Sequence, residues 1–425
     1  MKKKCFILNI LLFLLADNKI LTNEKCDNNE NSQKKECTIV DATLDRSQNG
    51  YNKTDADWAI IGAGPAGIIT IGVLLDIGVA PERITWVDPE FKVGRLSSYP
   101  AVPANNKTKF FIEFINACSS FKECKCDVID KLNSADPEIE HPLAIVIEPL
   151  KAIASHLRTK VKSIVGQLDS LDFNEQVWQV GVSDKRFTST HVVLASGSHP
   201  KRLDYNCNKE IPLDTALDPA QLKQLVNAED NVVVVGSCHS AILLLKYLSE
   251  LSVKWIVNLY KNPIKYAVDM GMWVLNSNSG LNGATARWAR EVLEKNPPTN
   301  ILRLKNTKEN RDEVLKICTK IIYAVGFERN ELPSIEQNPK LIYDDSTGVI
   351  APRLFGIGIA FPEKITDPLG NVEYKVGLTS FLRYAQRVIP VWANSDAERR
   401  ANIRRFEEHL HALEKFNDFF TVNLL

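Results

Sequence analysis

The chain carries the stretch Asp57-Trp58-Ala59-Ile60-Ile61-Gly62-Ala63-Gly64-Pro65-Ala66-Gly67, a short apolar strand that runs into Gly-x-Gly-x-x-Gly and an apolar helix. Gly62 permits the tight turn from strand to helix, Gly64 lets a pyrophosphate approach the backbone, and Gly67 lets the helix pack closely on its strand. The free N–H groups and positive dipole end of that helix would face the phosphates. The residues expected at this cofactor site are Gly62, Gly64, Pro65, Ala66 and Gly67.

Two features downstream of the glycine motif support a dinucleotide site. The next apolar segment, 84–87, ends in Asp88, about twenty residues beyond the motif, where an acid can accept hydrogen bonds from ribose hydroxyls. Gly94 and Arg95 follow, and the arginine would place a cation beside the same pyrophosphate. We therefore expect Asp88 and Arg95 to contact this first dinucleotide.

A second unit of the same kind follows later in the chain. An apolar strand over 231–235 leads into Gly236-Ser237-Cys238-His239-Ser240-Ala241 and an apolar helix. The next strand, 255–260, ends at Lys261, and a basic group at that place accommodates a 2′-phosphate, which favours NADP over NAD. The residues expected to bind it are Gly236, Ser237, Ser240 and Lys261.

Each unit closes with a strand that runs into a turn of small residues. Residues 191–194 precede Ala195-Ser196-Gly197, and residues 320–323 precede Ala324-Val325-Gly326-Phe327. Strands and helices alternate from Asp57 onward, which is typical of an α/β fold with parallel sheets. The sequence thus predicts two Rossmann-like dinucleotide-binding domains, with Gly197 close to the first cofactor.

Composition and the N-terminus bear on partners and location. The chain carries 52 basic and 52 acidic residues, so no net charge attracts nucleic acid. Three lysines precede an apolar run over 5–16, so residues 1–20 are expected to be a signal peptide or membrane anchor, followed by a disordered linker over 21–56. Because NADPH is supplied mainly inside cells, we expect an endoplasmic-reticulum-like lumen or a membrane, ahead of secretion or the cytoplasm.

Four ordered elements make the chain resemble the two-dinucleotide-binding-domain flavoproteins, the superfamily of flavin-containing monooxygenases and pyridine-nucleotide-disulphide reductases. They are Gly62–Gly67, Ala195–Gly197, Gly236–Ala241 and Ala324–Phe327. The resemblance covers residues 57–395 and implies FAD at the first unit, NADP at the second, and an NADP domain inserted into the FAD domain. The expected parts are an FAD domain over 57–213 and 336–395, an NAD(P) domain over 214–335, and a C-terminal helix over 396–425.

The sequence after the first unit indicates the branch of this superfamily. Disulphide reductases need a redox-active cysteine pair there, and no cysteine lies between Asp88 and Lys107. Those reductases also have an acid in the run that matches 354–360, where this chain has Ile359 beside Gly358. The resemblance therefore favours the monooxygenases, with Gly358 at the FAD site.

Asn106 is the candidate catalytic residue. The segment from Tyr99 to Lys109 is similar to a monooxygenase segment whose asparagine lies beside the flavin ring. A neutral amide there could hydrogen-bond the flavin without supplying a proton. The alternative is a solvent-exposed loop, since Asn106 also begins a glycosylation sequon.

The resemblance implies an FAD-dependent, NAD(P)H-using oxidoreductase, most directly a monooxygenase acting on a small molecule. A reductase that passes electrons to another acceptor is one alternative, and a nucleotide-binding protein without turnover is another. The second alternative stays open because Cys238 replaces the middle glycine of the second turn and crowds the NADP pyrophosphate path. We expect the neighbouring His239 to cap the helix; the alternative is a donor toward the phosphates or an acid on the nicotinamide side.

Overall fold

The computed structural model describes residues 54–174, 177–205, 209–333 and 342–394. The predicted signal segment over 1–20, nearly all of the linker and the helix over 396–425 lie outside the described residues. Within the described part of the chain, no helix is both long and apolar enough to cross a membrane.

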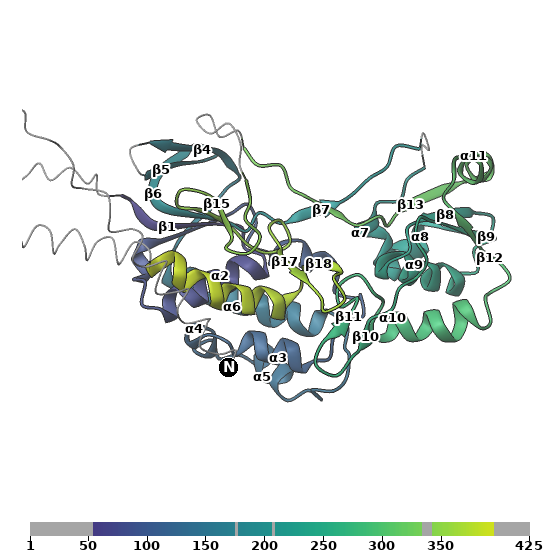
Figure 1. The fold of residues 1–425 in the computed structure, drawn as a ribbon, viewed down its shortest axis with the longest axis horizontal. Helices are drawn as coiled ribbons and strands as arrows, with labels where there is room; N and C mark the ends of the chain where they lie inside the picture. Colours follow the sequence, from purple (N-terminus) through teal and green to yellow (C-terminus); the bar gives the residue numbers. More distant parts are fainter. Residues whose placement is uncertain (1–53, 175–176, 206–208, 334–341, 395–425) are drawn as a thin grey trace, which may run out of the picture. The chain divides into compact units, whose positions relative to one another are not determined.

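The first domain is built on an eight-stranded sheet (Figure 1). Its central strands run parallel in the order β16-β6-β1-β2-β3, and β15 pairs antiparallel with β16 at the edge. Two further strands, β4 and β5, continue from β6 as an antiparallel meander. The bounds are β1 Ala56–Ile61, β2 Ile84–Asp88, β3 Lys162–Val165, β4 Leu168–Asn174, β5 Val177–Val182, β6 Lys185–Leu194, β15 Val349–Ala351 and β16 Leu354–Gly356.

The side chains of β1 point alternately to the two faces of this sheet, as the two-residue period of a strand requires. Trp58 and Ile60 belong to the core beneath the helices, whereas Ala59 and Ile61 belong to the core beneath the β4–β5 meander. The helical face is covered by α2 (Pro65–Asp76), α6 (Ala144–Lys160), the shorter α3 (Lys109–Ile115), α4 (Ser119–Lys122) and α5 (Asp127–Asn133), and helical residues 378–394. A strand with both faces buried explains why 58–61 is apolar throughout.

The second domain repeats this plan on a four-stranded parallel sheet in the order β12-β9-β8-β13. Val232 and Val234 of β8 pack with α9 and α10, and Val233 and Val235 face the opposite core. The bounds are β8 Asn231–Val235, β9 Trp255–Tyr260, β12 Ile301–Lys305, β13 Lys320–Tyr323, α7 Leu213–Ala216, α8 Pro219–Leu225, α9 His239–Glu250, α10 Gly283–Trp288, the π-helix Ala289–Glu294 and α11 Lys308–Ile317.

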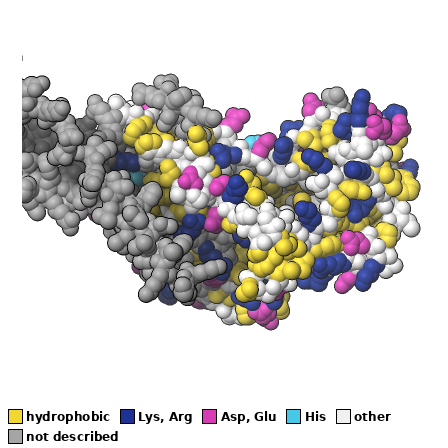
Figure 2. All heavy atoms as spheres, viewed as in Figure 1, with side chains coloured by type: hydrophobic (Ala, Val, Ile, Leu, Met, Phe, Trp, Pro, Cys, Tyr) yellow, Lys and Arg dark blue, Asp and Glu magenta, His cyan; other side chains and the backbone are white. Residues whose placement is uncertain are grey.

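The second domain is an insertion in the first. The chain leaves the first sheet after β6 and crosses along β7 (Ser198–Pro200), and it returns along β14 (Phe327–Arg329). These two crossings pair antiparallel, with Pro200 opposite Phe327 and Ser198 opposite Arg329. Two hairpins, β10 (Val268–Asp269) with β11 (Val274–Leu275) and β17 (Glu363–Thr366) with β18 (Val372–Lys375), complete the strands. On the face shown in Figure 2, acidic and basic side chains both occur among the described residues.

Candidate functional site

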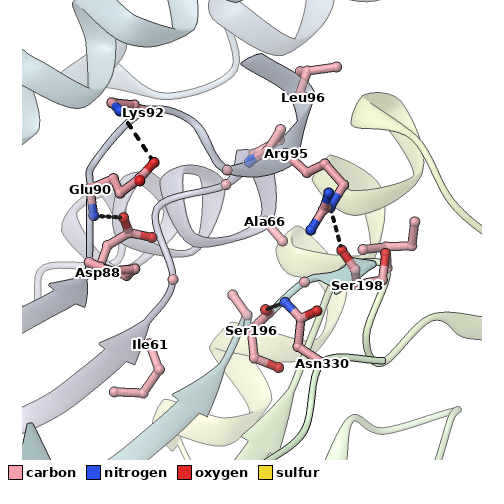
Figure 3. A pocket seen from close by; sticks show the side chains of 18 of the residues that line it. Ile61, Ala66, Asp88, Glu90, Lys92, Arg95, Leu96, Ser196, Ser198 and Asn330 are labelled. Atoms are coloured by element: carbon pink, nitrogen blue, oxygen red, sulfur yellow. Dashed lines mark hydrogen bonds and ion pairs between the residues drawn. The ribbon is translucent and has the colours of Figure 1, made fainter. Parts of the chain in front are cut away.

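A cavity of about 570 Å³ opens at the carboxyl ends of β1 and β6, where parallel sheets bind ligands. This volume falls in the usual range for small-molecule sites. Figure 3 shows that its walls come from segments far apart in the sequence. The lining residues fall within 61–66, 87–99, 166–168, 195–198, 327–333, 357–359 and 376–381.

The glycine motif forms one wall, and its three glycines have different surroundings. A Cβ on Gly62, whose φ is +111°, would lie 2.3 Å from the Ala195 carbonyl oxygen. A Cβ on Gly67 would lie 1.9 Å from the Gly62 carbonyl oxygen, so both positions tolerate only glycine. A Cβ on Gly64 would meet nothing within 4 Å. Gly64 therefore faces open space in the cavity, at the start of α2.

The N-terminus of α2 is suited to an anion. Gly64 is the N-cap residue, and no side chain caps the helix. Gly64, Pro65 and Ala66 line the cavity, whereas Gly67 contributes through its packing against Gly62 and is not a lining residue. Uncapped N–H groups at a helix N-terminus, together with the helix dipole, provide a phosphate site.

Asp88 lines the cavity, but its carboxylate also holds the backbone together. Oδ2 accepts a hydrogen bond from the Ala63 N–H at 2.7 Å, and Oδ1 accepts from Glu90 N at 2.8 Å and Phe91 N at 2.6 Å. The carboxylate is buried, and it ties the glycine turn to the loop that follows β2. The sequence predicted the position of Asp88 at the site but not this bridging role.

Arg95 reaches the cavity from the 3₁₀ turn Gly94–Ser98, and its guanidinium is already paired. Nη1 forms an ion pair with Asp214 at the start of α7, and Nε donates to the Ser198 carbonyl oxygen at 2.9 Å (Figure 3). Tyr99 donates its hydroxyl to the same Asp214 carboxylate. Burial, and then this hydrogen bond, raise the pKa of Tyr99. Arg95 is therefore fixed at the cavity wall by both domains.

The turn after β6 forms a further wall of the cavity. Ser196 Oγ is buried without a hydrogen-bond partner, and Gly197 beside it has a φ of +74°. Asn330 donates from Nδ2 to the Ser196 carbonyl oxygen at 2.8 Å, and its Oδ1 lies 3.0 Å from His199 Nδ1. The sequence pattern predicted Gly197 here but not Asn330, which follows the second small-residue turn by only three residues. The orphaned Ser196 hydroxyl and the uncapped α2 fit a phosphate-bearing dinucleotide.

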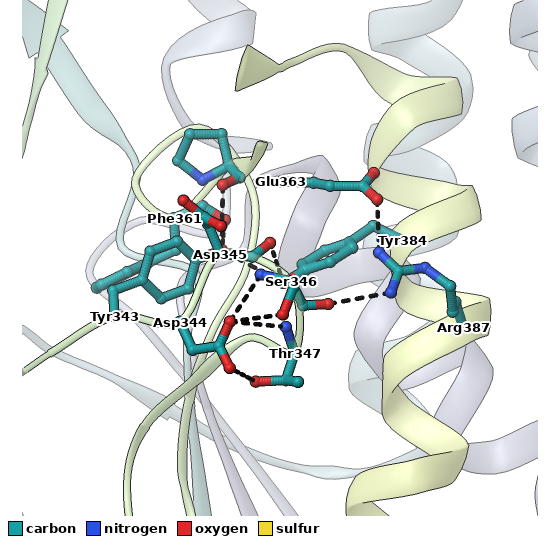
Figure 4. A network of polar contacts seen from close by, with 10 residues as sticks. Tyr343, Asp344, Asp345, Ser346, Thr347, Phe361, Glu363, Tyr384 and Arg387 are labelled. Atoms are coloured by element: carbon teal, nitrogen blue, oxygen red, sulfur yellow. Dashed lines mark hydrogen bonds and ion pairs between the residues drawn. The ribbon is translucent and has the colours of Figure 1, made fainter. Parts of the chain in front are cut away.

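Helical residues 378–394 contribute Leu378 and Phe381 to the cavity. A polar network secures this helix to the loop over 343–348 (Figure 4). Tyr384 donates to the Asp345 carbonyl oxygen at 3.2 Å, and Arg387 donates to the Ser346 carbonyl oxygen at 3.0 Å and pairs with Glu363. The network thereby sets the position of one cavity wall.

Two other expected site residues lie apart from the cavity lining. Gly358, at a φ of +86°, packs against the start of α2, because a Cβ there would lie 2.5 Å from the Ala66 Cβ. Its neighbours Ile357 and Ile359 line the cavity instead. Asn106 is exposed in a bend and is not among the lining residues, so its catalytic role stays a prediction.

The second glycine turn repeats the geometry of the first. A Cβ on Gly236, whose φ is +134°, would lie 2.1 Å from the Ala324 carbonyl oxygen, as Gly62 faces Ala195. Cys238 is an exposed thiol at the N-cap of α9, which has no side-chain cap. Ser237 and Ser240 flank it at the partly exposed turn, and Lys261 is exposed directly after β9.

His239 does not cap α9, contrary to the sequence-based expectation. Its Nε2 accepts a hydrogen bond from the Asn282 backbone N–H at 2.9 Å, so the ring joins α9 to the turn before α10. Burial lowers the pKa of His239 to about 4, which keeps Nε2 unprotonated and able to accept. The expectation of a helix cap is wrong because the imidazole bonds to a backbone N–H 43 positions later in the chain and not to α9.

Two strand–glycine turn–helix units, each facing the carbonyl oxygen of an alanine in a small-residue turn, define a protein with two dinucleotide-binding domains. The chain belongs to the pyridine nucleotide-disulphide oxidoreductase family, which matches residues 56–358. Both the predicted superfamily and the predicted fold class, two Rossmann-like domains with one inserted in the other, are confirmed.

The proteins to which this chain is similar include two monooxygenases and one disulfide reductase. Monooxygenase AgnR1 of Paecilomyces divaricatus is 28% identical over 383 residues, which are 78% of this chain and 97% of that protein. The structure of a flavin-containing monooxygenase from Stenotrophomonas maltophilia matches with a TM-score of 0.55 at 15% identity, covering 80% of this chain and 98% of that one. A bacillithiol disulfide reductase from Staphylococcus aureus matches with a TM-score of 0.50 at 10% identity over the same shares.

Proposed function

We propose that the protein is an FAD-dependent oxidoreductase that takes hydride from NADPH and oxygenates a small-molecule substrate. The observation that carries this proposal is the cavity at Gly64, which is lined by an uncapped helix N-terminus and by Ser196, whose buried hydroxyl has no hydrogen-bond partner. Family membership supports an oxidoreductase. The sequence similarity to a monooxygenase along most of both chains favours oxygenation.

The residues of the cavity have distinct tasks in this proposal. The N–H groups at the start of α2 would hold the FAD pyrophosphate, and Arg95 would face it from the other side. The Ser196 hydroxyl would donate to the cofactor. Bound FAD would supply the redox chemistry, while Leu378 and Phe381 exclude water from the apolar part of the cavity.

The cysteines of the described residues argue against a disulphide reductase. None of Cys118, Cys124, Cys126, Cys238 and Cys318 lines the cavity. Burial raises the pKa of Cys118 to about 12 and that of Cys124 to about 11, which suppresses their thiolates at neutral pH. A flavoprotein reductase with another electron acceptor remains the second candidate, since the same cavity would serve it.

The visible spectrum of the purified protein tests the proposal. Bound flavin that NADPH bleaches, followed by oxygen uptake without free peroxide in the presence of substrate, is the expected result. Bleaching with release of peroxide alone under every substrate tried would favour the reductase. A colourless protein that FAD cannot reconstitute would refute both functions and leave a protein without turnover.

The apolar start of the chain is the ground for a further part of the proposal, which concerns location. We infer a lumenal or membrane-associated enzyme because the basic residues and apolar run have the layout of an export signal. Sequencing the N-terminus of the protein from its native cell tests this. A soluble cytosolic chain that begins at Met1 would refute it.

A further inference from the structure

The two glycine turns give a common reference by which the strands that follow them can be compared. In each unit, the N–H of the first glycine donates to a carbonyl oxygen of the next strand, which is Val87 at 2.8 Å in the first unit and Leu259 at 2.9 Å in the second. The residue after that carbonyl is Asp88 in the first unit and Tyr260 in the second. Tyr260, and not Lys261, therefore occupies the position of the motif acid. The second unit has an aromatic ring where the first has the carboxylate that favours unmodified ribose hydroxyls.

The same comparison matches Trp86 with Asn258, two residues earlier in each strand. Trp86 Nε1 donates to the Gly62 carbonyl oxygen at 3.0 Å, and Asn258 Nδ2 donates to the Gly236 carbonyl oxygen at 2.8 Å. Asn258 is fully buried, although the other buried residues of β9 are apolar. A side chain of the neighbouring strand thus holds each glycine turn. In the second unit this side chain is an amide, which also has an oxygen that must be paired.

The partner of the Asn258 amide oxygen is Arg303, on the edge strand β12 (Figure 1). Arg303 lies opposite Asn258 in the register of β12 and β9, and its Nε donates to Asn258 Oδ1 at 3.0 Å. The guanidinium carbon of Arg303 lies 4.9 Å from the centre of the Tyr260 ring. One buried amide therefore connects the glycine turn with a guanidinium that lies over the residue at the position of the motif acid.

The remaining donors of the Arg303 guanidinium have no partner among the described residues. Both Nη groups lack a hydrogen bond there, and no described carboxylate forms an ion pair with Arg303. The charge of Glu294 acts on it only through space, while burial lowers the pKa of Arg303. A partly buried cation without a counter-ion favours an anionic ligand. The paired N–H groups of a guanidinium match the geometry of a phosphate.

We propose that Arg303 binds the 2′-phosphate of NADP, with its guanidinium oriented by Asn258 and by the ring of Tyr260. Lys261 is exposed directly after β9 and would add positive charge without a fixed direction. Arg303 would discriminate NADPH from NADH although its strand, β12, is separated from the glycine turn by β9. This inference rests on the proposed use of NADPH as the reductant.

The test compares Arg303→Gln with the wild-type full-length protein, both loaded with FAD. Glutamine keeps an N–H for the Asn258 amide oxygen but removes the charge. Titration gives the dissociation constants of NADPH and NADH. We expect Arg303→Gln to weaken NADPH about tenfold, as for a hydrogen bond to a charged group, and to leave NADH unchanged. The matched control is Arg311→Gln, because the Arg311 guanidinium also lies over a tyrosine ring, that of Tyr205 at 4.8 Å, on the opposite face of the same sheet. The control should match the wild type for both nucleotides.

A second measurement identifies the phosphate as the contact. The inhibition constants of 2′,5′-ADP and 5′-AMP are determined in competition with NADPH. Their ratio should favour 2′,5′-ADP in the wild type and fall about tenfold in Arg303→Gln. An unchanged ratio, or an equal loss of NADPH and NADH affinity, would overturn the role of Arg303 and leave the proposed oxidoreductase intact. A wild-type protein that holds flavin but binds neither NADPH nor NADH would refute the proposed function as well.

Discussion

At the scale of single residues, Gly64 differs from the two glycines that flank it in the motif. Gly62 and Gly67 are needed for folding, because a side chain on either would collide with a carbonyl oxygen. Gly64 has a φ of −72°, which any residue adopts, and open space where a side chain would be. The motif therefore separates into two positions that serve the fold and one that serves the ligand.

Gly64→Val should leave the fold intact and abolish FAD binding, since its methyl groups would occupy the phosphate path. Thermal unfolding without flavin should change little, as is usual where no native contact is lost. The comparison is Gly67→Ala, which should lower the melting temperature because its Cβ would lie 1.9 Å from the Gly62 carbonyl oxygen. A yellow Gly64→Val protein would contradict the assignment of this cavity.

Cys238 is the residue by which the second turn departs from a glycine-rich pattern. Cys238→Gly should tighten NADPH binding severalfold, because the exposed thiol no longer crowds the helix N-terminus, while glycine at an N-cap costs only a few tenths of a kcal/mol. The dissociation constant of NADPH, determined by titration, measures the effect. Cys318→Ser serves as the control, because Cys318 lies just before β13, at the end of the parallel sheet opposite the glycine turn. Equal or weaker NADPH binding in Cys238→Gly would show that the thiol does not obstruct the site.

At the scale of elements, His239 connects α9 with the turn before α10 through a hydrogen bond that only the neutral ring can accept. The folded-state pKa of about 4 lies below the ordinary value of 6.5. The unfolded chain therefore binds the proton first as the pH falls, and this contribution to stability, complete above pH 6.5, is lost as the pH approaches 4.

His239→Gln should reduce this pH dependence, because glutamine can accept the same hydrogen bond without titrating. Urea unfolding at pH 7 and at pH 5 measures it. Between these two values, the wild type should lose more of its unfolding free energy than the variant loses. Parallel losses in the two proteins would mean that His239 is protonated equally in the folded and unfolded states.

The hydroxyl of Tyr343, which is partly buried, connects the loop over 343–348 with the segment around Phe361 and with the cavity-lining helix. Tyr343 donates to the Phe361 carbonyl oxygen at 2.7 Å, and its hydroxyl lies 3.4 Å from that of Tyr384 (Figure 4). Tyr343→Phe should lower the free energy of unfolding by about 1–2 kcal/mol, since the carbonyl loses its donor. Tyr374→Phe, at a tyrosine that is 53% exposed on β18, should cost almost nothing. Equal effects in chemical denaturation would contradict the network.

Element by element, the sequence predicted helices and strands best where their pattern was local. The sequence over 148–160 predicts a helix, but α6 begins four residues earlier, at Ala144. It continues through Pro149 in its second turn, where the missing N–H leaves one carbonyl of the helix without its usual donor. The sequence over 110–120 predicts one helix, which the structure divides into α3 and α4. The sequence over 162–173 and 176–182 predicts strands, and they are present as β3, β4 and β5. The antiparallel pairing of β4 with β5 could not be predicted from their composition.

At the scale of the whole molecule, the cavity depends on long-range side-chain contacts that no local sequence pattern predicts. Asp214 pairs with Arg95 across 119 positions, and Asn330 bonds to Ser196 across 134. The glycine turns were predictable because their constraint is local backbone geometry. These long-range partners were not, since they follow from how two domains meet around one space.

Because β7 and β14 pair with each other, we expect that the inserted domain can be deleted without breaking the first domain. Pro200 and Phe327 stand opposite each other in an antiparallel pair, so the two-residue Asn-Gly turn of a tight hairpin can join them directly. A chain with Asn-Gly in place of residues 201–326 should fold, bind FAD and show a flavin spectrum that NADPH no longer bleaches. Loss of FAD binding in this shortened chain would instead mean that the cavity needs Asp214 and its domain to keep its shape. The chain leaves and re-enters the first domain at one antiparallel strand pair. Folding of the shortened chain would show that one nucleotide-binding domain can be exchanged for another at that pair.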